Sequence, residues 1–147
     1  MGREESTIKT ITITVPGTPV AKARARVSIR KGKVRAYTTS KTKDYEESIK
    51  WAAVEVMKGK SPLRFALKVN VKFVFLPPKS WSKRMRNTAI MGSTPHTVKP
   101  DLDNLIKNLD ALNGVVFNDD NQIVEIQAEK IYGENPMAIF KIEEINN

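Results

Sequence analysis

The chain has 147 residues, of which 40% are hydrophobic and 28% charged, a composition that allows one globular domain with a buried core. It has no cysteine, which excludes disulfide frameworks and cysteine-ligated zinc or iron–sulfur sites, and His96 is its only histidine. Lysine and arginine number 25 against 16 aspartates and glutamates, and the resulting net charge of +9 favours a polyanionic partner such as nucleic acid.

No stretch of the sequence approaches the roughly 20 consecutive apolar residues of a membrane-spanning helix. The first residues also lack the apolar core of a secretory signal. We therefore expect a cytoplasmic protein with no membrane partner. Because histidine and cysteine are so scarce, any metal ion must be held mainly by oxygen atoms, which points to Mg²⁺, Mn²⁺ or Ca²⁺ rather than zinc.

Periodicity in the first half of the chain predicts a strand, a hairpin and a helix. Ile11, Ile13 and Val15 alternate with threonines, as in a half-buried strand. The basic segment 22–38 has turn residues at 31–33 and is predicted to form a hairpin. Over residues 42–58 apolar residues recur at helical spacing, and this stripe comprises Tyr45, Ile49, Ala52 and Val56, widened by Trp51, Ala53 and Met57.

The second half of the chain predicts three further strands and a helix. Apolar residues alternate from Phe65 to Phe75, which indicates a strand, and further strands are predicted near 122–132 and 137–145. A helix is predicted over 102–112. Residues 77–100 contain four prolines and several basic residues, and we interpret them as a long, mobile basic loop. This order predicts an α+β fold, a mixed β-sheet with helices packed on it in a single domain spanning 1–147.

Two segments concentrate the positive charge. Residues 22–35 contain seven basic residues and no acid, and residues 79–86 add four more basic residues. Basic side chains in such runs neutralise DNA phosphates. We therefore predict DNA contacts at Lys22, Arg24, Arg26, Arg30, Lys33, Arg35, Lys83, Arg84 and Arg86.

The acidic residues gather later, in two groups. Pro100 and Asp101 begin the predicted helix, with Asp101 near its N-cap, and Asp103, Lys107 and Asp110 share one side of that helix. The second group lies in the segment Asn118-Asp119-Asp120-Asn121 before the next strand. Purely structural roles are also open on spacing alone: Asp101 as a cap, Asp103 paired with Lys107, and the second group as turn residues.

The stretch from Lys99 to Val124 reads KPDLDNLIKNLDALNGVVFNDDNQIV, and it resembles the signature of RusA-type Holliday-junction resolvases, chiefly those of phages and prophages. That family has a D-x-D-N-x-x-K segment on a helix, then an apolar run, then a D-D-x-Q-I/V turn. The basic segment from Pro19 to Arg26, followed by Tyr37-Thr38, also resembles the family's N-terminal part. One departure is the sequence 95–100, where some relatives have an arginine-rich run.

The resemblance implies a Mg²⁺-dependent endonuclease, with Mn²⁺ as a substitute, that resolves four-way DNA junctions by paired symmetric nicks. It assigns metal binding to Asp101, Asp103 and Asp120, and a catalytic role to these residues and to Lys107. It also implies a homodimer, because two symmetric nicks need two active sites. Two other functions stay open: a non-catalytic basic nucleic-acid-binding module, and a metal nuclease acting on flaps or single strands.

Overall fold

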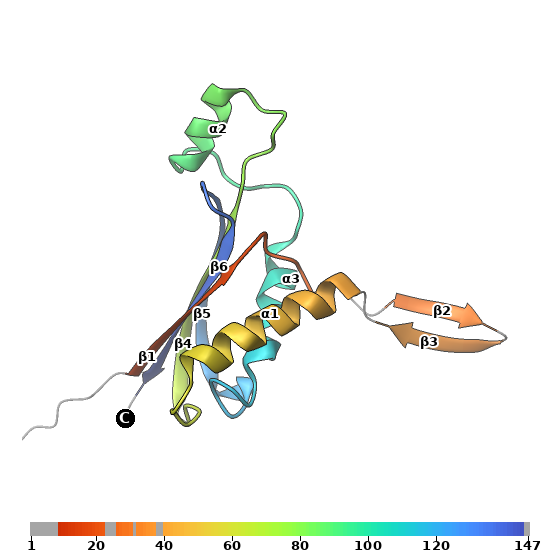
Figure 1. The fold of residues 1–147 in the computed structure, drawn as a ribbon, viewed down its shortest axis with the longest axis vertical. Coiled ribbons are helices and arrows are strands. Elements are labelled where there is room, and N and C mark those ends of the chain that lie inside the picture. The colour runs from red at the N-terminus through yellow and green to blue at the C-terminus, as the bar shows by residue number, and fades with distance from the viewer. Residues whose placement is uncertain (1–8, 23–25, 31, 38–39, 146–147) are drawn as a thin grey trace, which may run out of the picture.

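The fold is a four-stranded sheet with helices on one face (Figure 1), as seen in a computed structural model. The structure describes residues 9–22, 26–30, 32–37 and 40–145, and for 26–30 and 33–37 only the course of the backbone. Within the sheet the strand order is β1-β6-β4-β5. The strands are β1 (Lys9–Pro16), β4 (Ala66–Phe75), β5 (Ile123–Tyr132) and β6 (Met137–Ile145).

The sheet is mixed because its strands pair in both directions. β6 runs antiparallel to β1 on one side and to β4 on the other, while β5 runs parallel to β4. The register places Phe140 between Ile13 of β1 and Val71 of β4, and all three side chains are buried. The threonines that alternate with Ile11, Ile13 and Val15 are exposed, so one face of β1 is buried and the other faces solvent.

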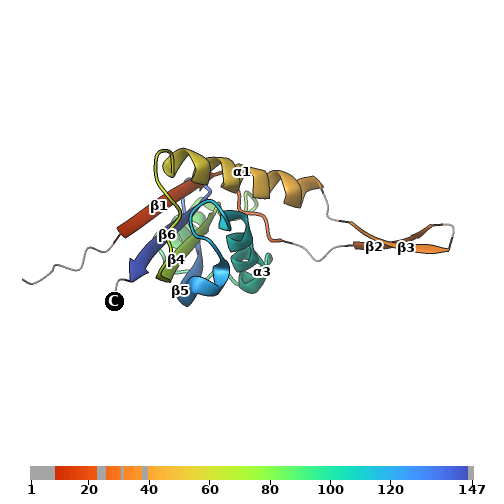
Figure 2. The same cartoon turned by 90° about the horizontal axis from the view of Figure 1, so that it is seen from below.

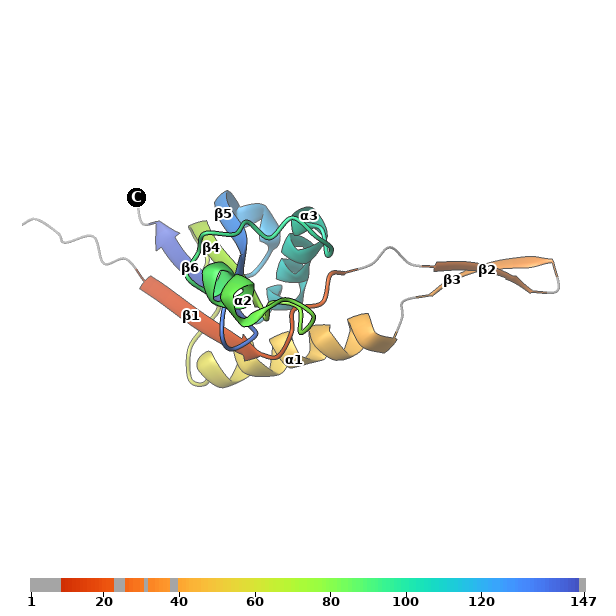
Figure 3. The same cartoon turned by 90° about the horizontal axis from the view of Figure 1, so that it is seen from above.

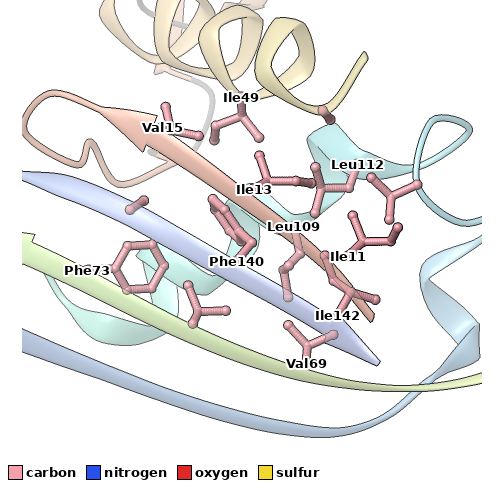
Figure 4. Close-up of a cluster of buried hydrophobic side chains, with 14 of the residues drawn as sticks. Ile11, Ile13, Val15, Ile49, Val69, Phe73, Leu109, Leu112, Phe140 and Ile142 are labelled. Atoms are coloured by element: carbon pink, nitrogen blue, oxygen red, sulfur yellow. The ribbon is translucent and has the colours of Figure 1, made fainter. Parts of the chain in front are cut away.

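Helix α1 (Ser40–Val56) covers the buried face of the sheet together with the helical stretch 102–112, which lies further along the chain after β4 (Figures 2 and 3). Ile49 of α1 points toward Val15 and Ile13, and Leu109 and Leu112 complete this layer of the core (Figure 4). The expectation that Trp51 belongs to the apolar stripe is wrong, because its side chain is 69% exposed. Two residues from Ile49, it lies about 200° around the helix, on the solvent side.

A long crossover joins the parallel strands β4 and β5, because the chain must return to the other end of the sheet. It contains the helices α2 (Lys83–Ile90) and α3 (Leu102–Ile106), then the 3₁₀ helices η1 (Lys107–Leu112) and η2 (Asp120–Gln122). The expectation of one long loop over 77–100 is therefore corrected by α2, whose N-cap Ser82 accepts a hydrogen bond from the Met85 amide. The predicted helix at 102–112 is confirmed, with its second half wound as 3₁₀.

The basic segment forms the predicted hairpin, β2 (Arg26–Arg30) paired with β3 (Lys33–Tyr37). This two-stranded ribbon extends away from the sheet and helices (Figures 1 and 2). The α+β prediction is confirmed, with a four-stranded mixed sheet and helices packed on it. Among the described helices, none combines the length and the apolar character that crossing a membrane requires.

Candidate functional site

The first acidic group lies at the start of α3. Asp101 occupies the N-cap, as predicted, but its carboxylate makes no capping hydrogen bond. Asp103 accepts a hydrogen bond of 2.9 Å from the Asn104 amide, and Lys107 donates one of 3.0 Å to the side-chain oxygen of Asn104. Within the described part of the chain, Lys107 forms no ion pair with Asp103, and both aspartates are exposed. The carboxylates of this group are therefore accessible to an external cation.

The second acidic group is a turn in which the two adjacent aspartates have different roles. Asp119 caps η2, because its side chain accepts from the Asn121 amide at 3.2 Å and its own amide donates to Gln122 Oε1 at 2.8 Å. Turn chemistry therefore accounts for Asp119. Asp120 is not used as a cap, and its side chain is exposed.

Asp120 lies close to two other carboxylates. A hydrogen bond with Asp119 and repulsion from it raise the pKa of Asp120, and the Asp110 carboxylate adds to this rise. The fold thus brings Asp110 of η1 beside the acidic turn. Repulsion among these carboxylates would be relieved by a proton or by a bound cation.

The acidic residues lie on three parts of the crossover: Asp101 and Asp103 at the start of α3, Asp110 on η1, and Asp119 and Asp120 in the turn before β5. Among the described residues, no three carboxylate or imidazole side chains form a group that could hold a metal ion. The oxygen donors suit a hard divalent cation. A site shared by Asp101, Asp103 and Asp120 nevertheless stays a prediction.

Lys22, expected to contact DNA, is engaged within the chain. Its ammonium group lies 3.1 Å from Asp110 Oδ2 and 3.8 Å from Glu46 Oε2. Its backbone amide also donates to the Asn104 carbonyl at 3.1 Å. Two residues earlier, the Val20 carbonyl accepts from Asn108 Nδ2 at 2.8 Å. These contacts fix the described chain at 20–22, upstream of the basic hairpin, to the helix that carries the acidic residues.

The other basic residues occupy two separate places. Lys83 and Arg84 are exposed on α2 and Arg86 is half-buried there. In the hairpin, the backbone register pairs Arg26 with Tyr37, Ser28 with Arg35, and Arg30 with Lys33, so this ribbon face collects the basic positions. Arg24 lies outside the described residues. DNA contact by any of these residues stays a prediction.

The chain leading into Asp101 is held by β5. Lys130 of β5 donates hydrogen bonds to the carbonyl oxygens of Val98 at 2.8 Å and Pro100 at 2.9 Å. Just upstream, His96 is buried between the rings of Phe75 and Tyr132, at centroid distances of 4.5 and 4.7 Å. These contacts dock the end of the segment 77–100 on the sheet.

Trp81 belongs to the same cluster of aromatic rings. Its ring lies 5.4 Å from that of Tyr132, and the side chain is half-buried against the core. The segment that carries the basic helix α2 is therefore anchored to the sheet by an aromatic contact at its start.

The structure is that of an α+β protein with a strongly basic sequence, in which the crossover of a mixed sheet carries two groups of accessible carboxylates. The sequence matches the family described as Endodeoxyribonuclease RusA over residues 16–143, and the chain belongs to this family. It is an endodeoxyribonuclease of the Holliday-junction resolvase type, which hydrolyses phosphodiester bonds in branched DNA. RusA resolvases generally depend on a divalent metal.

A relative of similar length exists in Bacillus subtilis (strain 168). The chain is 34% identical over 139 residues to the uncharacterized protein YqaN, and the match covers 92% of this chain and 97% of that protein. The similarity thus extends over nearly the whole of both chains.

Three residues of this region had no assigned role in the sequence analysis: Asp110 as a neighbour of Asp120, Lys130 as the residue behind Asp101, and Gln122 in the acidic turn. The helical spacing of Asp103, Lys107 and Asp110 was visible in the sequence, but the return of η1 to the acidic turn was not. No pattern in the sequence indicated a role for Lys130, because an isolated lysine in a strand is usually a solvated side chain.

Proposed function

We propose that this protein resolves four-way DNA junctions by Mg²⁺-dependent, paired symmetric nicks, with Mn²⁺ able to replace Mg²⁺. The observation that carries the proposal is the pair of accessible acidic groups on the crossover, in a chain whose family cleaves branched DNA. Oxygen ligands such as these carboxylates are the ones that Mg²⁺ prefers. When bound, the ion would activate water and neutralise charge on the leaving oxygen.

The residues divide into three roles. Asp101, Asp103 and Asp120 would hold the metal ion, as the family resemblance implies. Lys107, exposed one helical turn after Asp103, would stabilise negative charge on the phosphate. Asn104 supports this role, because its side-chain oxygen accepts a hydrogen bond from Lys107 and so holds the ammonium group next to the residue that follows Asp103.

The basic hairpin and helix α2 would bind the DNA backbone on either side of the acidic residues. The hairpin extends from the body, which suits contact with a second arm of a junction (Figure 1). The contacts of Val20 and Lys22 support this arrangement, because they attach the chain upstream of the hairpin to α3 and η1.

Paired nicks require two active sites, so we propose a homodimer with two-fold symmetry. The contact surface we propose is the edge strand β5, on which Val124 is 65% exposed and Ile126 is 41% exposed. An edge strand with exposed apolar residues is the kind of surface to which a second chain adds. Sedimentation at micromolar concentration tests this point.

The central experiment incubates the protein with a labelled four-way junction and Mg²⁺, beside duplex, flap and single-stranded substrates of the same sequence. We expect symmetric nicks in opposite strands of the junction and little cleavage of the duplex. Preferential cutting of flaps or single strands would instead assign the protein to that class of nuclease. If the protein binds the four-way junction tightly but does not cleave it in Mg²⁺ or Mn²⁺, it is a non-catalytic nucleic-acid-binding module.

A further inference from the structure

A second surface borders the acidic turn, at the end of the sheet where β4 and β5 begin. The backbone of Arg64 and Phe65, just before β4, is fixed by Glu144 at the end of β6. Oε2 of this carboxylate accepts the amide of Arg64 at 3.0 Å and the amide of Phe65 at 3.1 Å. Glu144 is only 5% exposed, and its buried carboxylate group holds this segment in place through these two hydrogen bonds.

Gln122 holds the same segment from the other side. Its side-chain nitrogen donates to the carbonyl oxygens of Leu63 at 2.9 Å and Phe65 at 3.0 Å. Gln122 also completes the capping box with Asp119, so one side chain links the acidic turn to the start of β4. Phe65 is therefore a direct neighbour of the turn that carries Asp120.

The side chain of Phe65 stays half exposed although its backbone is held on both sides. It is 48% exposed, which corrects the expectation that it begins the buried row of β4. The guanidinium of Arg64 lies 5.8 Å from the centroid of its ring. An aromatic ring beside a cation, presented on a fixed backbone, is the arrangement that proteins use to stack nucleic-acid bases.

A hollow of about 740 Å³ continues this surface away from the acidic turn. Its apolar lining includes Met57 and Leu63, and its cations are Lys9, Lys60 and Arg64. The carboxylate among the lining residues, Glu144, is already occupied by two backbone amides. The charge along this path is therefore positive, as a phosphate backbone requires.

We propose that a DNA strand passes from the acidic turn along this end of the sheet, with Phe65 stacking on a base at the branch point and Lys60 and Arg64 binding its phosphates. This inference rests on the proposed action on DNA junctions and adds a DNA path separate from the hairpin and α2. A base is the occupant we favour because Phe65 is the one large apolar side chain of this lining that is exposed, and the cations Lys60 and Arg64 lie in the same lining. A stable protein interface needs about 800 Å² from each partner.

The test compares Phe65→Leu with Trp51→Leu, a matched loss of an exposed aromatic on α1. Binding is measured without Mg²⁺ on a four-way junction and on duplex DNA. Loss of one stacking contact should weaken junction binding about tenfold in Phe65→Leu and leave duplex binding unchanged. Trp51→Leu should bind both substrates as the wild type does.

A second variant, Lys60→Gln with Arg64→Gln, changes only exposed charges and tests the path if Phe65→Leu does not fold. We expect the slope of log affinity against log salt to fall by about two counterions. Unchanged junction affinity in Phe65→Leu, or an unchanged slope in the double variant, overturns the path. A shift of Phe65→Leu from dimer to monomer in sedimentation also overturns it, because a second copy would then cover the ring.

Failure of this inference is distinguishable from failure of the proposed function. If the wild type cuts junctions while both variants bind as the wild type does, only the path is wrong. If the wild type cuts no branched DNA, the proposed function fails, whatever the binding measurements give for Phe65.

Discussion

The ammonium group of Lys130 donates a hydrogen bond of 2.9 Å to the carbonyl oxygen of Pro100, the residue directly before Asp101. A second bond, of 2.8 Å, reaches the carbonyl of Val98. Lys130 pairs in register with Phe73, so it lies on the helix-covered face of the edge strand β5. One side chain of the sheet therefore holds the two carbonyl groups that lead into the first acidic group.

Lys130→Met should release this segment while keeping an unbranched side chain of similar size. We expect a loss of about 1–3 kcal/mol in the free energy of unfolding, because two carbonyl groups lose a charged donor. Urea denaturation measures this loss. Lys141→Met, at an exposed position on β6, is the matched control and should change stability by less than about 0.5 kcal/mol. Equal stability of the two variants would show that Lys130 does not hold the segment.

The acidic residues should be needed for cleavage and dispensable for binding. We expect Asp103→Asn and Asp120→Asn each to lower junction cleavage by roughly 100-fold or more, since each removes a ligand for the metal ion. Junction affinity should stay the same or rise, because a negative charge near phosphates is lost. Asp44→Asn, exposed on α1, is the control and should cut normally. Full Mg²⁺-dependent nicking by either site variant would contradict the metal assignment.

Lys107 should affect turnover more than affinity. Lys107→Ala is expected to bind a junction within about twofold of the wild type and to cut it roughly 100-fold more slowly in single-turnover assays. Lys107→Arg, which keeps the charge, should recover part of the rate. A parallel fall of binding and cleavage in Lys107→Ala would make this residue an ordinary contact to the DNA backbone.

The order of strands and helices was predictable from the sequence because each element carries its own period. Strict alternation predicted β1 and β4, and the apolar stripe from Tyr45 to Val56 predicted α1. Helix α2 escaped notice because its eight residues have few apolar positions and lie between prolines. The spacing of apolar residues indicates a helix or strand only where the element buries one face. Because α2 buries little more than Ala89, its sequence carries almost no such spacing.

The site was predictable only in part. The sequence predicted both acidic groups, but it could not predict contacts between residues that lie far apart in the chain. The bond from Lys130 to Pro100 depends on the register of β5, and the position of Asp110 beside Asp120 depends on where η1 ends. The exposure of Phe65 likewise follows from the start of β4 at Ala66, one residue later than the alternation indicated.

The hairpin should contribute affinity through charge alone. Replacing Arg26, Arg30 and Lys33 together by alanine removes three positive charges from one face of the ribbon. We expect weaker junction binding and a salt slope lower by about three counterions, with the same change for duplex DNA. Binding at several salt concentrations measures the slope. An unchanged slope would show that this face of the hairpin points away from DNA.

His96 should make the stability of the protein depend on pH. Burial between Phe75 and Tyr132 lowers the pKa of His96, and the positive charge of Lys130 lowers it further. The folded protein therefore disfavours the protonated ring, which the unfolded chain accepts near its ordinary pKa of about 6.5. The stabilising contribution of the neutral ring is present above that pH and is lost as the pH falls toward the lowered pKa of the folded state.

His96→Phe keeps an aromatic ring in the cluster and removes the titration. Free energies of unfolding measured from pH 8 to 5 should fall more steeply for the wild type than for His96→Phe, with the difference between the curves opening below about pH 6.5. Parallel curves over that range, or an imidazole NMR titration in the folded protein with a midpoint above 6.5, would show that the ring accepts its proton without cost to the fold.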